Sequence, residues 1–251
     1  MRTQDNTILI TGGATGIGFS LAETLISAGN KVIICGRRKN KLIEAKDKLP
    51  QLQTKVFDVS KENERKLLFS WVKDNFKDLN MVINNAGIQR AIDFQKGTRE
   101  LLSGEDEIAT NLVAPINLSA YFIPLLLKKN EAAIINVSSG LGFVPIAAMP
   151  VYCATKAAVH SFTMSLRYQL KDTSIRVFEI VPPAVDTELG KGSIDEESEY
   201  RGIPASEVAE AALAAIANDE YEIVVGEAGN LVMGARKNPE QTFQNINQWW
   251  N

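Results

Sequence analysis

The feature that most constrains the fold of this chain is a regular alternation of short apolar runs with longer amphipathic segments. The apolar runs are rich in Ile and Val and cover residues 7–10, 31–35, 54–57, 81–83, 133–137, 175–181 and 222–225. The segments between them have the spacing of helices and cover residues 18–28, 40–49, 62–76, 105–129, 151–171 and 205–217. Continuously apolar strands are covered on both faces, and strict alternation with helices requires parallel pairing through right-handed crossovers. The sequence therefore predicts an α/β fold, a doubly wound sheet of about seven parallel strands with helices on both faces.

The chain is predicted to form a single domain over residues 1–251, because no linker-like stretch, repeat or low-complexity tract interrupts this order. Its least organised part is residues 188–202, where Gly, Ser, Asp and Glu cluster between the sixth apolar run and the last predicted helix. We interpret this segment as a mobile flap over a substrate site, since the length of the chain leaves no separate substrate domain.

The charge balance and the histidine content exclude several classes of function. With 27 Lys and Arg against 30 Asp and Glu, the net charge is -3, so no broad positive field attracts nucleic acid. His160 is the single histidine, and one imidazole cannot build a zinc site of several histidines. We therefore expect no nucleic-acid partner, no metal site, and an acid/base group other than histidine.

The cysteines and the apolar stretches indicate a cytoplasmic protein without a membrane span. Cys35 and Cys153 lie far apart and form no CxxC pair, which favours two reduced, mostly buried thiols. The polar N-terminal residues lack the long apolar region of a signal peptide. The uncharged stretches 108–127 and 132–155 contain several Asn, Ser, Gly or Pro residues, so a buried helix and a buried strand account for them better than membrane spans.

A glycine-rich turn, Thr11-Gly12-Gly13-Ala14-Thr15-Gly16-Ile17-Gly18, connects the first predicted strand to the first predicted helix. Glycines at such a turn let the backbone approach a pyrophosphate, and the helix N-terminus offers unpaired N–H groups and a favourable dipole. Turns also use glycine without any ligand, but here the strand, the turn and the helix agree. The candidate dinucleotide-binding residues of this turn are Gly12, Thr15, Gly16, Ile17 and Gly18.

The spacing of this turn, Gly-x-x-x-Gly-x-Gly, resembles that of the compact short-chain dehydrogenases/reductases. Further motifs follow in that family's order: Asn84-Asn85-Ala86-Gly87, then Asn111, Ser138-Ser139, and Tyr152 with Lys156 as a Tyr-x-x-x-Lys pair. Ser139 precedes Tyr152 by 13 residues, which is the family's usual interval. Within the compact branch, the chain is most similar to the bacterial DltE-type oxidoreductases. The resemblance implies a Rossmann-like, NAD(P)-binding domain over nearly the whole chain.

The residue types of the Tyr-x-x-x-Lys pair point to acid/base chemistry. In a helix, Tyr152 and Lys156 stand one turn apart on the same face, with a rise of about 6 Å. A phenol titrates near pH ~10, and a neighbouring ammonium and a positive nicotinamide ring both lower its pKa toward the working range. Tyr152 then donates a proton to a carbonyl oxygen during reduction or removes it from a hydroxyl during oxidation, while Ser139 hydrogen-bonds the same oxygen. By resemblance, Lys156 also holds the nicotinamide ribose, and Asn111 anchors a water that relays protons to Lys156.

The end of the second predicted strand indicates which coenzyme is preferred. Gly36 is followed by Arg37, Arg38 and Lys39, and no carboxylate is present to bind a ribose 2′-hydroxyl. Arg37 and Arg38 can accept a 2′-phosphate, so we expect NADP(H) to be favoured over NAD(H). The alternative is a solvated basic start to the next helix, and Thr15 stands where a basic residue would strengthen the preference.

The resemblance assigns further cofactor contacts outside the glycine turn. It places Asp58 and Val59 at the adenine, and Pro182, Val185 and Thr187 near the nicotinamide carboxamide and the pyrophosphate. Asn85, Ala86 and Gly87 line the adenosine ribose in the family. Pro183 replaces the family's glycine and removes a backbone N–H, so the contacts of this segment are less well defined.

Two hypotheses about function remain open, and both involve a small molecule. The first is an NADP(H)-dependent oxidoreductase acting on an uncharged or partly apolar carbonyl or alcohol; the second is a cofactor-binding redox sensor or scaffold. The set of Asn111, Ser139, Tyr152 and Lys156 favours the enzyme. Candidate substrate-side residues are Gln89, Arg90, Leu141, Phe143, Val144, Met149 and Leu189. The helices beginning at residues 108 and 151 resemble those of four-helix interfaces in the family, so we expect a homodimer or homotetramer.

Overall fold

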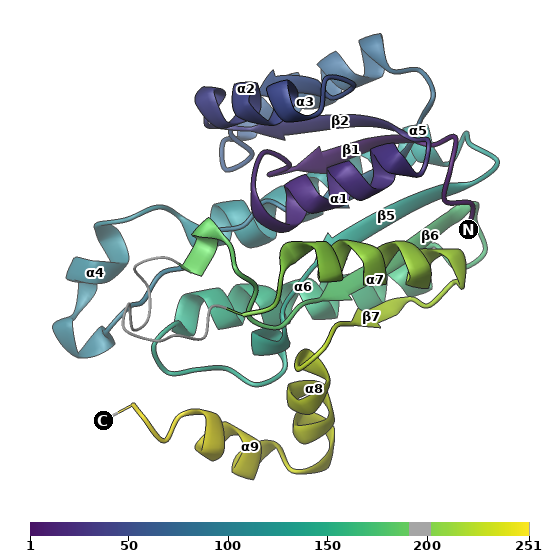
Figure 1. Ribbon diagram of the computed structural model, residues 1–251. Helices are drawn as coiled ribbons and strands as arrows, with labels where there is room; N and C mark the ends of the chain where they lie inside the picture. Colours follow the sequence, from purple (N-terminus) through teal and green to yellow (C-terminus); the bar gives the residue numbers. More distant parts are fainter. Residues whose placement is uncertain (191–201, 251) are drawn as a thin grey trace.

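The computed structural model describes residues 1–190 and 202–250, which form one parallel sheet covered by helices (Figure 1). The strands are β1 (Thr7–Thr11), β2 (Lys31–Gly36), β3 (Gln53–Val56), β4 (Leu79–Asn84), β5 (Ala132–Val137), β6 (Ile175–Val181) and β7 (Glu222–Val224). The helices are α1 (Gly16–Ser27), α2 (Lys39–Lys48), α3 (Glu62–Asn75), α4 (Thr98–Leu102), α5 (Ala114–Leu126), α6 (Pro150–Gln169), α7 (Ala205–Ala217), α8 (Ala228–Lys237) and α9 (Pro239–Ile246). The predicted fold is confirmed.

Both faces of the sheet are buried, and this explains why the strands are continuously apolar. Along β1, Ile8 and Ile10 point into the core under α1, α2 and α7, whereas Leu9 points into the core under α3, α5 and α6. Figure 1 shows α1 and α7 side by side over one face of the sheet, in front of the strands. Because helices cover both faces of the sheet, a polar side chain on either face of these strands would be buried, so successive strand positions are apolar.

The strand order β3-β2-β1-β4-β5-β6-β7 creates a crevice at the carboxyl ends of β1 and β4. After β1 the chain adds β2 and β3 on one side, and from β4 onward it adds strands on the other side. Connections therefore leave β1 and β4 in opposite directions. In open α/β sheets this topological switch point is where ligands bind.

The predicted helix over residues 105–129 begins with a wide π turn, η2 (Ala109–Val113), before α5 starts at Ala114. Pro115 lies four residues after Asn111, and in a regular α-helix its ring would clash with the Asn111 carbonyl. The π turn avoids this clash. The segment Ala109–Leu126 is long and apolar enough to cross a membrane, but Leu118, Phe122 and Leu126 are packed into the core, as in a core helix.

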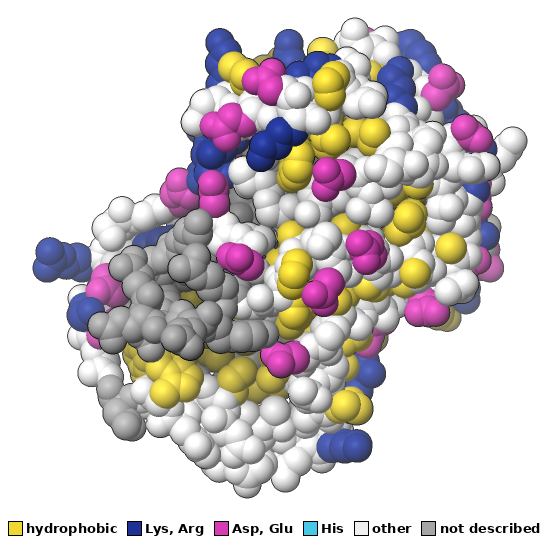
Figure 2. All heavy atoms as spheres, viewed as in Figure 1, with side chains coloured by type: hydrophobic (Ala, Val, Ile, Leu, Met, Phe, Trp, Pro, Cys, Tyr) yellow, Lys and Arg dark blue, Asp and Glu magenta, His cyan; other side chains and the backbone are white. Residues whose placement is uncertain are grey.

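Three short helices, α4, α8 and α9, were not predicted, because their segments lack long apolar periodicity. The predicted flap at 188–202 is described only at its ends: Glu188–Gly190 form a short 3-10 helix, η4, and residues 191–201 lie outside the described part of the chain. On the face seen in Figure 2, Lys and Arg side chains gather toward α2 and α3, and acidic side chains lie over the middle of the molecule.

Candidate active site

The glycine turn after β1 is packed so tightly that a Cβ at any of its four glycines would lie less than 3.0 Å from a neighbouring atom. A Cβ at Gly12 would lie 2.8 Å from Ala86 Cα, and a Cβ at Gly18 would lie 2.4 Å from the Gly12 carbonyl oxygen. Gly12 and Gly16 also have φ angles of 65° and 55°, which favour glycine. A Cβ at Gly16 would lie 2.9 Å from Thr187 Cγ2, so the turn and the segment after β6 are in contact.

The N-terminus of α1 opens toward this turn. Thr15 is the N-cap residue, yet its side chain makes no capping hydrogen bond within the described residues. Its hydroxyl instead accepts a hydrogen bond from Arg38 Nη2 at 3.1 Å. The first turn of α1 contains no acidic residue. The unpaired N–H groups and the positive end of the helix dipole therefore favour an anionic ligand here.

The ends of β1 and β4 are tied together by Thr11 and Asn85. The backbone N–H groups of Asn85 and Ala86 each donate to Thr11 Oγ1 at 3.0 Å. Asn85 Nδ2 in turn donates to the carbonyl oxygens of Thr11 and Gly12 at 3.0 and 3.2 Å. The Asn85 side chain thus ties the glycine turn to the end of β4.

Helix α6 presents Tyr152 and Lys156 on one face, as the sequence predicts. The Lys156 Nζ lies 5.6 Å from the centroid of the Tyr152 ring and donates to the Val137 carbonyl oxygen at 2.9 Å. Ser139 follows β5 and hydrogen-bonds Tyr152, and its Oγ also accepts from the Leu141 N–H at 3.1 Å. All three polar side chains are buried.

Asn111 reaches the same region from the π turn. Its Nδ2 donates to the Ile88 carbonyl oxygen at 2.8 Å and to Thr155 Oγ1 at 3.1 Å, and its Oδ1 accepts from the Ile88 N–H at 2.9 Å. A Cβ at Gly87 would lie 3.6 Å from both Asn111 Oδ1 and Lys156 Nζ. The structure therefore brings all four predicted catalytic residues to the carboxyl ends of β4 and β5.

Burial dominates the titration of these groups. It raises the pKa of Tyr152 to about 12, against a lowering by the hydrogen bond with Ser139. It lowers the pKa of Lys156 to about 8, against a raising by the negative charge of Glu179. The lowered tyrosine pKa that the sequence led us to expect is therefore not supplied by the protein's own groups, because the cost of burying a phenolate exceeds their stabilisation.

The two arginines after β2 are held in exposed ion pairs across the crevice. Arg37 Nη2 lies 2.7 Å from Glu105 Oε2, and Arg38 Nη1 lies 2.7 Å from Glu188 Oε2. Asp58 faces the same crevice, but its Oδ1 accepts from the backbone N–H and the hydroxyl of Ser60. Neither glutamate was singled out in the sequence, where nothing links Glu105 or Glu188 to the arginines.

A cavity of about 390 Å³ joins these features. The predicted residues that line it are Gly12, Thr15, Gly16, Ile17, Arg37, Arg38, Asp58, Val59, Asn85, Ala86, Gly87, Tyr152, Lys156, Pro182 and Thr187. Gly18, Asn111, Ser139 and Val185 are not in the lining; Gly18 packs on the turn, and Val185 forms a β-bridge with Ile203. Lining residues that the sequence analysis does not assign to the site are Ala14, Cys35, Gly36, Phe57, Ile88, Glu105, Thr110, Val137, Ser138 and Glu188.

The residues expected on the substrate side divide into those that line the cavity and those that do not. Leu189 lines the cavity together with Gln89 and Arg90. Val144 and Met149 are each only 1% exposed and do not line this cavity, which favours the alternative that they belong to the core. Leu141 packs against the cluster that contains Tyr152, and Phe143 packs against His160 at a ring distance of 4.3 Å.

Comparison with known proteins agrees with this geometry. The sequence model of the family "short chain dehydrogenase" matches residues 6–198, so the chain belongs to that family of oxidoreductases. It is 47% identical over 248 residues to a Bacillus subtilis protein named "Uncharacterized oxidoreductase DltE", covering 98% of each chain. The similarity to DltE-type oxidoreductases that the sequence indicates is thereby confirmed.

Solved structures show the same fold with nucleotides bound. A short-chain dehydrogenase from Burkholderia cenocepacia in complex with NADP has a TM-score of 0.80 at 26% identity and covers 98% of both chains. A short-chain dehydrogenase/reductase from Burkholderia phymatum in complex with NAD has a TM-score of 0.80 at 21% identity, covering 95% of this chain and 98% of that one. Both coenzymes thus occur on this fold.

Proposed function

We propose that the chain is an NADP(H)-dependent oxidoreductase that interconverts a small, uncharged or partly apolar carbonyl compound and its alcohol, with Tyr152 as the acid/base. The observation that carries this proposal is the position of Tyr152 and Lys156. Both side chains line the cavity that also contains the glycine turn and the arginines after β2. A scaffold or sensor needs the glycine turn alone, whereas this arrangement adds a proton-transfer group to it.

The nicotinamide coenzyme supplies the hydride when it is bound, and the residues of the chain handle the proton. Tyr152 Oη gives a proton to the carbonyl oxygen during reduction and takes it from the hydroxyl during oxidation. Ser139, bonded to Tyr152, orients the same oxygen. Lys156 supplies a positive charge beside the Tyr152 ring, and Asn111 fixes the Ile88 backbone, which follows the Gly87 position near the Lys156 ammonium.

The coenzyme preference rests on Arg37 and Arg38. Both guanidinium groups lie on the cavity, and Arg38 also bonds Thr15 at the start of α1. A 2′-phosphate next to them would exchange two solvent-exposed ion pairs for charge-assisted bonds to a dianion. The glycine cradle and the uncapped N-terminus of α1 are suited to the pyrophosphate, with Gly12, Gly16 and Ile17 in the lining.

We also propose that the protein is a cytoplasmic homo-oligomer that pairs through α5 and α6. Both helices expose apolar side chains: Ile116 on α5 is 36% exposed, and on α6 Met164 is 53% and Tyr168 72% exposed. Pairing with a second copy of the chain would remove these side chains from water. Burial raises the pKa of Cys35 to about 12 and also raises that of Cys153, which suits two unreactive thiols.

The decisive experiment is a panel of aldehydes and ketones assayed by the absorbance of NADPH, with Tyr152→Phe as the variant. Phe keeps the ring and its packing but removes the proton, so we expect a loss of about 100- to 10,000-fold in kcat. NADPH binding, followed by fluorescence, is the control and should change little. Turnover that survives the substitution, or binding of NADPH without turnover of any compound, contradicts the proposed mechanism.

A further inference from the structure

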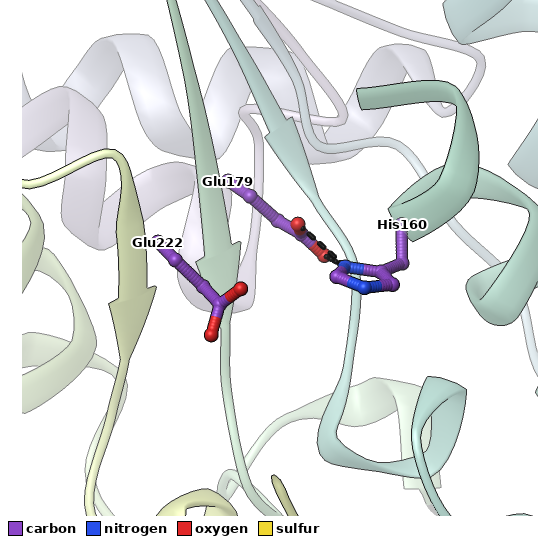
Figure 3. Close-up of side chains that lie close together, drawn as sticks. All are labelled: His160, Glu179 and Glu222. Carbon is purple, nitrogen blue, oxygen red and sulfur yellow. Dashed lines mark hydrogen bonds and ion pairs between the residues drawn. The ribbon is translucent and has the colours of Figure 1, made fainter. Parts of the chain in front are cut away.

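A buried carboxylate on β6 takes no part in the mechanism proposed above. Glu179 is 0% exposed and lies between the buried apolar residues Phe178 and Ile180 of its strand. Its Oε1 accepts a hydrogen bond from Ser138 Oγ at 2.5 Å, and its Oε2 lies 2.8 Å from His160 Nδ1 (Figure 3). A fully buried carboxylate is costly unless it is paired and hydrogen-bonded, so this position requires an explanation.

The partners of Glu179 are direct neighbours of the proposed catalytic residues. Ser138 immediately precedes Ser139 at the end of β5, and His160 follows Lys156 by one turn of α6. The negative charge of Glu179 also raises the pKa of the Lys156 ammonium, against the effect of burial. One carboxylate therefore acts on both elements that carry the reaction.

The charges around Glu179 come from three elements besides its own strand. Lys156 and His160 approach from α6, and Glu222 lies opposite on β7. Glu222 is bonded to Arg236 of α8 at 2.6 Å, which balances the second carboxylate. The ligand atoms of His160, Glu179 and Glu222 lie within 4.8 Å of one another, as in a metal site. His160 Nδ1 is already paired with Glu179, however, and Glu222 with Arg236, so these pairs account for the group without an ion.

We propose that Glu179 is a positioning residue for the reaction proposed above: it fixes the end of β5 through Ser138 and the middle of α6 through His160, and it places a buried negative charge near Lys156. His160 completes the arrangement by closing the carboxylate off from solvent on the α6 side. The inference rests on the proposed function, and it explains why a glutamate stands in a buried strand.

The single histidine makes the pairing directly measurable. The His160 imidazole gives one resonance in a proton NMR titration of the whole protein, and no assignment among several histidines is needed. The hydrogen bond that His160 donates to the Glu179 carboxylate raises the pKa of His160, so wild type should titrate above the ordinary histidine value. In Glu179→Gln, which keeps the shape and the oxygen for Ser138, we expect the midpoint to fall back to or below the ordinary histidine value. In the matched control Glu222→Gln, the fall should be smaller.

The effect of Glu179 on the proposed catalytic residues is measured by the titration of Lys156. With 13Cε-labelled lysine, assigned by Lys156→Met, we expect Glu179→Gln to lower the titration midpoint of Lys156 by about one pH unit. The alkaline limb of the kcat/KM profile should move down by the same amount, while the Glu222→Gln profile stays in place. An unchanged Lys156 midpoint in Glu179→Gln overturns the proposal even in an active enzyme.

The outcomes separate this proposal from the proposed function. If no carbonyl compound is reduced, the proposed function fails, and the two NMR titrations still report on Glu179. If Glu179→Gln does not fold, the wild-type titration decides: a His160 midpoint at or below about 6.5 contradicts the pair. Broadening of the His160 resonance by stoichiometric Mn²⁺ would show an occupied metal site instead and would also overturn the proposal.

Discussion

Replacing Arg37 by alanine tests the coenzyme preference, because Arg37 faces the cavity from the end of β2. If Arg37 binds the 2′-phosphate of NADP(H), Arg37→Ala removes at least one charge-assisted hydrogen bond. Such bonds contribute about 1.5–3 kcal/mol, which corresponds to a loss of about 10- to 150-fold in NADPH affinity. NADH has no 2′-phosphate, so its affinity should change by less than about twofold.

Binding of the 2′-phosphate by Arg37 is opposed by the ion pair that Arg37 forms with Glu105. Its atoms lie 2.7 Å apart, but the two side chains are 42% and 53% exposed. An exposed pair contributes about 1 kcal/mol at most, so the phosphate bond is the stronger interaction. Glu105→Gln frees Arg37 and removes a negative charge near the phosphate, and it should tighten NADPH binding by up to about fivefold.

Fluorescence titrations with NADPH and NADH measure both variants against wild type. The difference between the two coenzymes is the decisive quantity, since damage to the fold weakens both equally. Added salt should weaken NADPH binding more than NADH binding. Tighter binding of NADH by wild type, or an equal loss of both coenzymes in Arg37→Ala, would refute the assignment.

Three further predictions follow from the packing and the charges. Gly18→Ala places a Cβ 2.4 Å from the Gly12 carbonyl oxygen and should cost about 1–3 kcal/mol of stability in urea unfolding, whereas Gly229→Ala, with nothing described within 4 Å, should cost nothing. Lys156→Met should have a free energy of unfolding about 3 kcal/mol higher than wild type at pH 7, because a pKa lowered from 10.5 to about 8 shows that the buried charge is costly. This gain should shrink between pH ~8 and ~10.5, where the folded wild type loses the Lys156 proton before the unfolded chain does. A gain that does not depend on pH contradicts the assignment. Met164→Asp should shift the oligomer toward monomer in light scattering, unlike Leu67→Asp, which is equally exposed on α3; equal effects would argue against the α5–α6 interface.

Much of the architecture could be predicted from local pattern. The runs of Ile and Val located all strands to within two residues at each end, because a strand buried on both faces must be apolar at successive positions. Motifs at strand ends could also be placed, since the carboxyl ends of parallel strands meet at one edge. For that reason Gly12, Asn85 and Tyr152, which are far apart in the chain, line one cavity.

Local pattern did not predict the short helices or the packing of individual side chains. Helices α8 and α9 lack a long apolar stripe, and Val144 and Met149 look the same in sequence whether they face a substrate or the core. The π turn at Asn111 follows from Pro115, but its effect appears only once the helix is packed against Ile88 and Thr155.

The sequence by itself determined the fold, the glycine turn and the identity of the proposed proton donor, because each depends on residues close together in the chain. Only the tertiary structure decided which charges meet. Arg38 finds Glu188 across 150 residues, and Glu179 finds His160 and Ser138 from three different elements. The energy of a charge depends on its burial and on its neighbours in space, and neither is a property of the adjacent residues in the chain.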